Sequence, residues 1–436
     1  MHYKKPLNSE SDILCNLLRS FYLLFNVFYM KKGFGLLVMV VFVVCVQSIQ
    51  AQTATEYNNQ ALVKYKAKNY TGALQDFNKA VELDVKNETA WHNRGLVKYA
   101  LKDFDGAIKD HSRAIELNPA YANAYNDRAI VYYRLNDSKS ALQDYNKAIT
   151  LDPNYFMAYK NRAIFQYAAK HYEAAIKDYA KCIELEPRNA DGYMGRGSAK
   201  NMLKDYTGSL KDYDKAIEVD PSLAIAFLNR GNARYILSDM EGALSDFKKV
   251  AALQPDNANV YFNLGIIYTV QHKSSDAISV FKKYNSLLPK EWNGYKATAD
   301  IYYTQLSRYD SSAYFYDKAW QINKQEKEII ERYGLSLLNQ QKIPEAIAMF
   351  NNQIAYLPND PWGYYHLGAA YSVGKQPVEA IKNLDIALDK RMVELPYWET
   401  DKNLDNVRIL EEFKNMLKKY FNKDILAKYP ALFGGF

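Results

Sequence analysis

The sequence predicts an all-α solenoid of stacked helical hairpins, and two kinds of periodicity lead to this prediction. Proline recurs every 34 residues from Pro119 to Pro289, and columns of small and aromatic residues keep the same interval. A fixed period of this size is long enough for one helical hairpin. Each copy then buries its apolar face against the neighbouring copies.

The small and aromatic columns assign a role to each part of the repeat. In the second repeat Gly95 and Ala107 lie twelve residues apart, on either side of a short polar turn. An antiparallel hairpin brings such positions face to face, where small side chains let the backbones approach closely. His111 and Ala114 continue an apolar stripe along the second helix, and Pro119 ends that helix.

These positions together carry a family resemblance. The second repeat reads Ala90-Trp91-His92-Asn93-Arg94-Gly95, then Tyr99, Asp103-Phe104, Ala107, Ala114 and Asn118-Pro119. This set resembles the tetratricopeptide repeat, and the resemblance covers ten units from about Ala54 to Lys390. The resemblance implies two antiparallel helices per repeat, stacked into a right-handed superhelix with a concave inner face.

One repeat departs from the period. The register slips by one residue between Ala299 and Ser312, because Gly334 and Ala346 stand one position later than the period requires. We expect the additional residue in the turn of the eighth hairpin.

The three expected segments of the chain are residues 1–51, residues 52–390 with the repeats, and residues 391–436. In the last segment an apolar rhythm predicts one amphipathic helix that caps the solenoid. Its apolar positions are Leu404, Val407, Leu410, Phe413, Leu417 and Tyr420.

Residues 1–51 have the composition of an export signal. Met30-Lys31-Lys32 precedes an uncharged apolar run from Phe34 to Val46, and small and polar residues follow up to Ala51. A membrane-spanning helix needs roughly 20 residues, so a cleaved signal peptide and an exported protein are favoured over a permanent anchor. Translation from Met30 and a retained membrane-inserted segment from Ile13 to Val46 are the alternatives.

Charge and cysteine content narrow the class of protein. Removing residues 1–51 takes away five basic and two acidic residues, so the formal net charge falls from +7 to +4. Lysine and aspartate alternate along the helices, which does not favour nucleic acid as a ligand. Only Cys182 would remain, in a column otherwise filled by alanine, so we expect a buried thiol and no disulfide.

We find no motif for catalysis or for a cofactor. The sequence has no phosphate-binding glycine loop, no Cys-x-x-Cys and no His-Glu-x-x-His. The histidines are scattered over different repeats, without metal-ligand spacing. We therefore expect no enzyme, no cofactor and no metal site.

Two charged columns change together along the chain. Arginine becomes Leu264 in the repeat where aspartate becomes Val280, which predicts a structural ladder of partly buried ion pairs. The arginines are Arg94, Arg128, Arg162, Arg196 and Arg230, and the aspartates are Asp110, Asp144, Asp178, Asp212 and Asp246. Asp76, whose own repeat has no arginine, indicates a second possible register between neighbouring repeats. Arginines that face the groove and bind an acidic ligand are the functional alternative.

The exposed face of the first helices is the candidate binding groove. The resemblance places a tyrosine column on the concave surface, and tyrosine suits protein or peptide recognition; packing within the helices is an equally weighted interpretation. The candidate residues are Tyr99, Tyr133, Tyr167, Tyr235, His92, Leu96, Asn126, Ile130, Lys160 and Ile164.

The sequence therefore predicts a non-catalytic scaffold that binds a protein or peptide in the cell envelope. A membrane-tethered assembly or sensor component and an accessory subunit of an enzyme complex are the alternatives.

Overall fold

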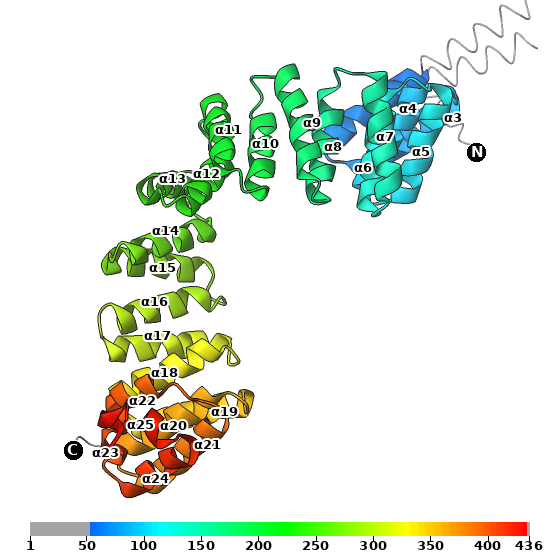
Figure 1. The fold of residues 1–436 in the computed structure, drawn as a ribbon. Helices are drawn as coiled ribbons and strands as arrows, with labels where there is room; N and C mark the ends of the chain where they lie inside the picture. The colour runs from blue at the N-terminus through cyan, green and yellow to red at the C-terminus, as the bar shows by residue number, and fades with distance from the viewer. Residues whose placement is uncertain (1–52, 434–436) are drawn as a thin grey trace, which may run out of the picture. The chain divides into compact units, whose positions relative to one another are not determined.

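The computed structural model describes residues 53–433, and this part of the chain is entirely helical (Figure 1). The expected signal peptide, the start at Met30 and the membrane alternative fall outside the described residues. The chain divides into two compact units, one that ends at Ala199 and one that begins at Lys200. Each unit is described by itself.

The first unit is a stack of helical hairpins in chain order. A helix over residues 53–66 packs on α3 through Ala61, Ala73 and Phe77, and each later first helix pairs with the second helix that follows it. Its helices are α3 (Tyr70–Leu83), α4 (Glu88–Ala100), α5 (Phe104–Leu117), α6 (Ala122–Arg134), α7 (Ser138–Leu151), α8 (Phe156–Ala168) and α9 (Tyr172–Leu185). The boundary between the units falls within α10 (Ala190–Met202).

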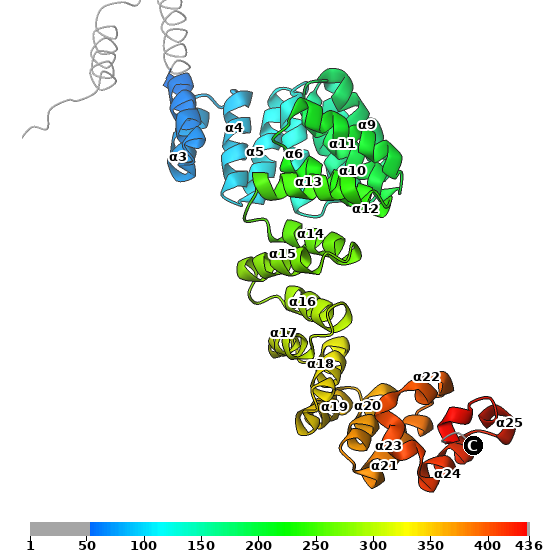
Figure 2. The ribbon, with the colours of Figure 1, turned by 90° about the vertical axis from the view of Figure 1, so that its left-hand side faces the viewer.

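The second unit continues the same order, and Figures 1 and 2 both show α14 to α19 following one another through the stack. Its helices are α11 (Tyr206–Val219), α12 (Ala224–Ile236), α13 (Met240–Leu253), α14 (Ala258–Val270), α15 (Ser274–Leu287), α16 (Asn293–Thr304), α17 (Tyr309–Ile322), α18 (Lys327–Asn339), α19 (Ile343–Tyr356), α20 (Pro361–Val373) and α21 (Pro377–Asp389). The helices up to α21 thus form the ten hairpins that the 34-residue period predicts.

The turn inside each of the first seven hairpins has a left-handed residue at the same position, which fixes the period. In the second hairpin Lys102 has a positive φ of 65°, and Asp103 then caps α5 by accepting a hydrogen bond from the Gly106 backbone amide at 3.0 Å. A left-handed residue ends the first helix and a side-chain cap starts the second. The positive φ recurs every 34 residues from Lys68 to His272.

The next positive φ comes one residue late, at Ser307, which confirms the predicted insertion in the turn of the eighth hairpin. The Arg308 amide donates to the Tyr302 carbonyl, six residues back, whereas the Asp103 amide donates to Lys98, five residues back. The additional residue therefore widens this turn and leaves the flanking helices in register.

Close contact between glycine and an aromatic ring holds the two helices of a hairpin together. A Cβ atom on Gly265 would lie 2.5 Å from the Phe281 ring, so only glycine lets this ring lie flat against the first helix. Gly231 and Gly334 meet Phe247 and Phe350 in the same way.

The segment after α21 differs from the expected single helix. Its short elements are α22 (Leu395–Thr400), η1 (Lys402–Leu404), α23 (Asp405–Arg408), α24 (Glu411–Tyr420), α25 (Lys423–Leu426) and η2 (Pro430–Phe433). The expectation of one continuous helix is wrong, because the chain breaks at Leu410, which has an extended conformation and precedes α24.

Trp398, Phe413 and Leu417 are buried in one cluster with Leu384 of α21, so this segment covers the end of the last hairpin.

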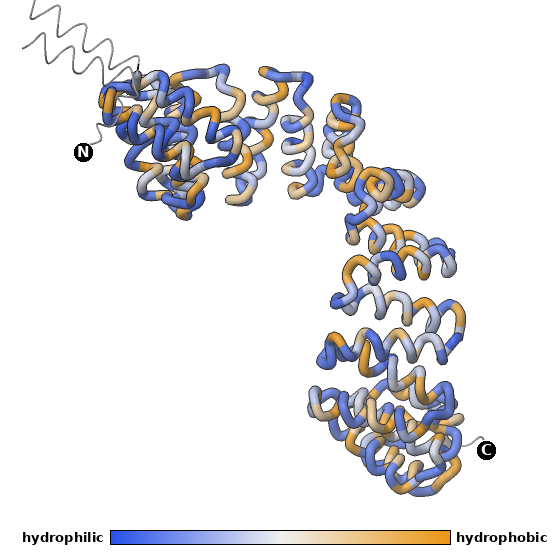
Figure 3. The backbone as a smooth tube through the Cα atoms, turned by 180° about the vertical axis from the view of Figure 1, so that it is seen from behind, coloured by the Kyte–Doolittle hydropathy of each residue, from blue (hydrophilic) through white to orange (hydrophobic). Residues whose placement is uncertain are grey.

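Along the helices hydrophilic and hydrophobic residues alternate in short runs (Figure 3). Within residues 53–433 no helix combines the length and the hydropathy that crossing a bilayer requires.

Candidate functional site

The first helices of the first unit form one continuous face. α4 contacts α6, and α6 contacts α8, whereas α5 and α7 touch each other less. The first helices therefore form the more closely packed, inner layer of the stack, and their free side chains form the inner face. Most of the candidate groove residues belong to this face; Tyr235 lies on α12 in the second unit.

The tyrosine column packs mainly within its own hairpin. Tyr99 lies 5.7 Å from the ring of Phe104 and Tyr167 lies 5.4 Å from the ring of Tyr172, between ring centroids. Tyr133 meets Phe165 of the next hairpin at 5.6 Å, and Tyr235 is partly buried against the core of its unit. All four rings are half-buried, so their exposed edges and hydroxyls are what remains for a ligand.

One polar contact is seen at each of three successive junctions between first helices, from the helix over residues 53–66 to α8. Asn93 donates to Asn58 at 3.2 Å, and Asn161 donates to Asn126 at 3.0 Å. His92 Nε2 lies 3.4 Å from Asp127 Oδ2. In each case the two residues are 35 positions apart.

These contacts change the interpretation of two candidate groove residues. His92 and Asn126 are only 5% and 2% exposed, because they hold neighbouring helices together. Sequence reasoning missed their partners in the adjacent column, although polar pairs 35 residues apart were a signal that could have found them.

Burial is the largest cause of the pKa shifts in the contact between His92 and Asp127. It lowers the pKa of His92 to about 4 and raises the pKa of Asp127 to about 6. A hydrogen bond from Asn126 at 2.9 Å partly opposes the shift at Asp127. Near neutral pH the imidazole is therefore uncharged and the carboxylate charged.

The open part of the inner face lies on α8. Met157 and Ile164 are each 43% exposed, and with Lys160 and Tyr167 they follow helical spacing along one side. Lys160 is half-buried and forms an ion pair with Asp191. This side of α8 therefore combines exposed apolar side chains with an ion pair and a tyrosine hydroxyl.

Nearer the N-terminus the inner face is more closed. Leu96 and Ile130 are half-buried, and the Tyr99 hydroxyl accepts a hydrogen bond from Arg134 Nε at 3.0 Å.

The charged columns form ion pairs within single hairpins. Four of the five arginines bond the aspartate 16 residues ahead through Nε and Nη2, at 2.6 to 3.0 Å, a bidentate geometry. The pairs are Arg94 with Asp110, Arg128 with Asp144, Arg162 with Asp178, and Arg230 with Asp246. The aspartates are at most 7% exposed.

A third helix takes part in each pair. Nη1 of Arg94 donates to Asn78 at 3.1 Å, and Nη1 of Arg162 donates to Asn146 at 2.6 Å, each in the preceding hairpin. Arg128 bonds Ser112 in the same way. One guanidinium therefore ties its own hairpin to the one before it.

Some aspartates hold a second cation four residues after the arginine position. Lys98 lies 2.8 Å from Asp110, and Arg234 lies 2.8 Å from Asp246. Asp212, on α11, pairs with Lys200 at 2.8 Å, and Arg196 lies on α10.

Asp76 pairs with Lys64 of its own hairpin at 2.6 Å, so the alternative register between Asp76 and Arg94 is not used. The arginines of the four pairs above are engaged with buried carboxylates and do not offer free charge to a ligand.

Other candidate chemistry is limited in the described part of the chain. Cys182 is buried, and burial raises the pKa of its thiol to about 12, so it stays protonated. Within residues 53–433 no group of three histidine, cysteine, aspartate or glutamate side chains is arranged to hold a metal ion.

Fold and site together define a class of protein, the α-solenoid built from repeated two-helix units. Family profiles described as tetratricopeptide repeat match residues 86–154 and 159–189, and one described as TPR repeat matches 202–238 and 231–270. A profile of the protein prenyltransferase alpha subunit repeat matches residues 70–97. The chain therefore contains tetratricopeptide repeats in these residues.

Solved structures with a similar fold include YrrB, described as a TPR protein with an unusual peptide-binding site. It is 22% identical, with a TM-score of 0.38, over 42% of this chain and 94% of its own. A tetratricopeptide repeat protein from Parabacteroides merdae is 19% identical, with a TM-score of 0.43, over 61% of this chain and 99% of its own.

The C-terminal part of a TPR protein from Cytophaga hutchinsonii is 18% identical, with a TM-score of 0.47, over 55% of this chain and 98% of its own. The likeness in all three concerns the fold alone. A comparison with curated proteins finds no match.

Proposed function

We propose that this protein is a non-catalytic scaffold that holds a peptide or protein segment on the inner face of its first helices, with the main contact on α8. The observation that carries the proposal is the exposure of Met157 and Ile164 beside Lys160 on that face. Large apolar side chains at 43% exposure gain free energy when a partner covers them.

Side-chain contacts between the first helices support a preformed inner face. His92 contacts Asp127 and Asn161 donates to Asn126, which connects α4 with α6 and α6 with α8. A preformed surface loses little conformational entropy when it binds. The peptide-binding site named for the similar YrrB fits the same kind of function.

A double substitution tests the binding face. Met157→Asp with Ile164→Asp should prevent crosslinking of the partner to the first unit in the native host, because buried carboxylates replace the apolar contact. Leu135→Asp with Leu142→Asp is the matched control, since these side chains are 42% and 37% exposed and lie in the turn after α6 and on the second helix α7. Equal recovery of the partner by both variants would exclude α8 as the binding face.

We further propose that the protein is exported and acts in the cell envelope. The charged, apolar and small-residue order of residues 30–51 supports this proposal. Intact mass of the mature protein from its host should correspond to a chain that starts at Gln52. A mass that retains the apolar run, with the protein in the membrane fraction, would support a tethered component instead.

A further inference from the structure

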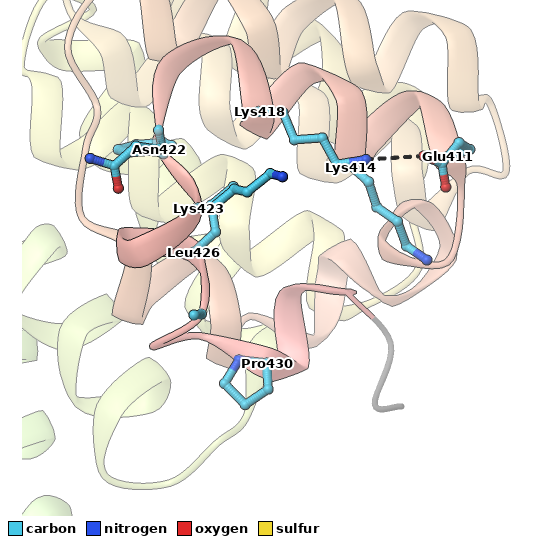
Figure 4. Close-up of a pocket in the computed structure, with 9 residues that line it drawn as sticks. Glu411, Lys414, Lys418, Asn422, Lys423, Leu426 and Pro430 are labelled. Atoms are coloured by element: carbon cyan, nitrogen blue, oxygen red, sulfur yellow. Dashed lines mark hydrogen bonds and ion pairs between the residues drawn. The ribbon is translucent and has the colours of Figure 1, made fainter.

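The C-terminal segment has a hollow of about 980 Å³ on its outer side, at the upper end of the range for ligand pockets. One wall is the outward side of α24, and the other is the chain from Asn422 to Pro430 (Figure 4). It lies outside the inner face discussed above. The buried side of α24, with Phe413 and Leu417, faces the last hairpin, so this outer side is not used in capping.

The charge of the hollow is positive. Lys414, Lys418 and Lys423 line it, with Glu411 as the one acidic lining residue. Glu411 bonds Lys418 at 3.2 Å, as the dashed line in Figure 4 shows. Among the described residues no ion pair holds Lys414 or Lys423, so two ammonium groups remain available to an anionic ligand.

The remaining lining is apolar. Leu426 is 6% exposed and forms the floor, with Phe421, Ala427 and Pro430 around it. The ligand class is therefore amphipathic, with carboxylates for the lysines and an apolar group for the floor.

The spacing of the charges fits an extended peptide. Lys414 and Lys418 are one helical turn apart, about 6 Å along the axis. Alternate side chains of an extended chain point the same way at a spacing of about 6.6 Å. We propose that this hollow binds an extended acidic peptide segment in which carboxylate and apolar side chains alternate, the carboxylates towards the lysines, Lys414 and Lys423 above all, and the apolar groups towards Leu426 and Pro430.

Fluorescence anisotropy with the purified full chain tests this site. The probe is a fluorescein-labelled six-residue peptide that alternates glutamate and leucine, and the comparison peptide alternates lysine and leucine. The acidic probe should bind, with an affinity that falls as salt is raised, because the contacts are exposed ion pairs. No binding of the acidic probe at millimolar concentration, or equal binding of the basic peptide, would overturn the proposal.

Two variants locate the bound probe. Lys414→Glu with Lys423→Glu should weaken binding by at least about tenfold, and Ala427→Trp should do the same by filling the hollow without changing charge. The matched control is Lys382→Glu with Lys402→Glu, exposed lysines of the same unit outside the hollow, which should leave the affinity within about twofold. Circular dichroism melts establish that each variant is folded.

Equal loss in the control pair would show a general charge effect and overturn the proposed site. Displacement of the probe by laurate as effectively as by unlabelled peptide would identify a hydrocarbon amphiphile as the ligand instead. The variant with Met157→Asp and Ile164→Asp should bind the probe normally, so failure of the inner face and failure of the hollow are distinguishable.

Discussion

Arg162 donates from Nε and Nη2 to the two carboxylate oxygens of Asp178, at 2.8 and 2.6 Å, and its Nη1 reaches Asn146 of the preceding hairpin. Asp178 is 5% exposed, so the pair is largely removed from water. The same bidentate arrangement recurs in Arg128 with Asp144 and in Arg230 with Asp246. The arginine ladder is therefore a device that joins successive hairpins as well as the two helices of one hairpin.

Removing the arginine alone should be costly. Arg162→Leu leaves the Asp178 carboxylate buried without its cation, and we expect the free energy of unfolding to fall by about 3 to 5 kcal/mol. Urea denaturation followed by circular dichroism measures the change. A midpoint within error of the parent protein would show that the pair is not buried in solution.

The chain offers its own control for this substitution. Leu264 and Val280 occupy the same two positions in the seventh hairpin, so Arg162→Leu with Asp178→Val copies a natural combination. The double variant should recover most of the lost stability, because no charge remains unpaired. A double variant as unstable as the single one would indicate that the arginine acts through packing alone.

The cost of losing arginine should differ between repeats. Asp110 keeps Lys98 at 2.8 Å when Arg94 is replaced, whereas Gln166 stands at the corresponding position beside Asp178. We expect Arg94→Leu to lower the free energy of unfolding by about 1 to 2 kcal/mol less than Arg162→Leu does. This difference is the contribution of a hydrogen bond to a charged group. Parallel urea titrations of the two variants and of Arg94→Leu with Lys98→Met test this order, and the last should match Arg162→Leu.

His111 should make the protein sensitive to acid. Its ring is fully buried, and neither ring nitrogen has a hydrogen-bond partner among the described residues. Burial, followed by the charges of His92 and Arg128, lowers its pKa well below the usual value. The other repeats place Tyr145, Phe247 or Phe281 in this column, so a carbocyclic ring fits the site.

His111→Phe should therefore raise the free energy of unfolding by about 1 to 3 kcal/mol at neutral pH, because two unsatisfied polar atoms disappear. The unfolded chain protonates His111 near pH 6.5, whereas the folded chain does so only at much lower pH. The stability that the neutral histidine retains above pH 6.5 is thus lost as pH falls towards its folded pKa. The advantage of the variant should grow between pH 6.5 and 4.5; a constant difference across that range would contradict the assignment.

The regular part of the architecture was predictable because each column serves one contact. Gly265 against Phe281, and the arginine and aspartate positions 16 residues apart, follow directly from an antiparallel hairpin. The acceptors Asn78 and Asn146 were missed, although their column becomes Lys248 next to Leu264, where arginine disappears. The appearance of a positive charge in this column where the arginine is lost could have identified the column as the arginine's acceptor.

Two features do not follow from the columns of like residues that define the period. His92 and Asn126 occupy positions that the family resemblance leaves open to a ligand, but their partners on neighbouring helices bury them. The break at Leu410 lies in a segment that has no repeat, where spacing alone does not distinguish one helix from two short ones. Sequence periodicity therefore predicts contacts that one residue type makes in many repeats, and misses contacts whose residue types change between repeats or that lie outside the repeats.

The additional residue in the eighth hairpin gives a final prediction. Leu306 lies in the widened turn and is 40% exposed, and its deletion would restore the three-residue turn of the other hairpins. We expect this deletion to change the free energy of unfolding by no more than about 1 kcal/mol, because the loop shortens without moving either helix. Deleting Leu135 from the ordinary turn after α6 should instead draw a helical residue into the turn and rotate one helix face by about 100°. Thermal melts of the two deletion variants should differ widely, and a similar loss of stability in both would place the inserted residue elsewhere in the repeat.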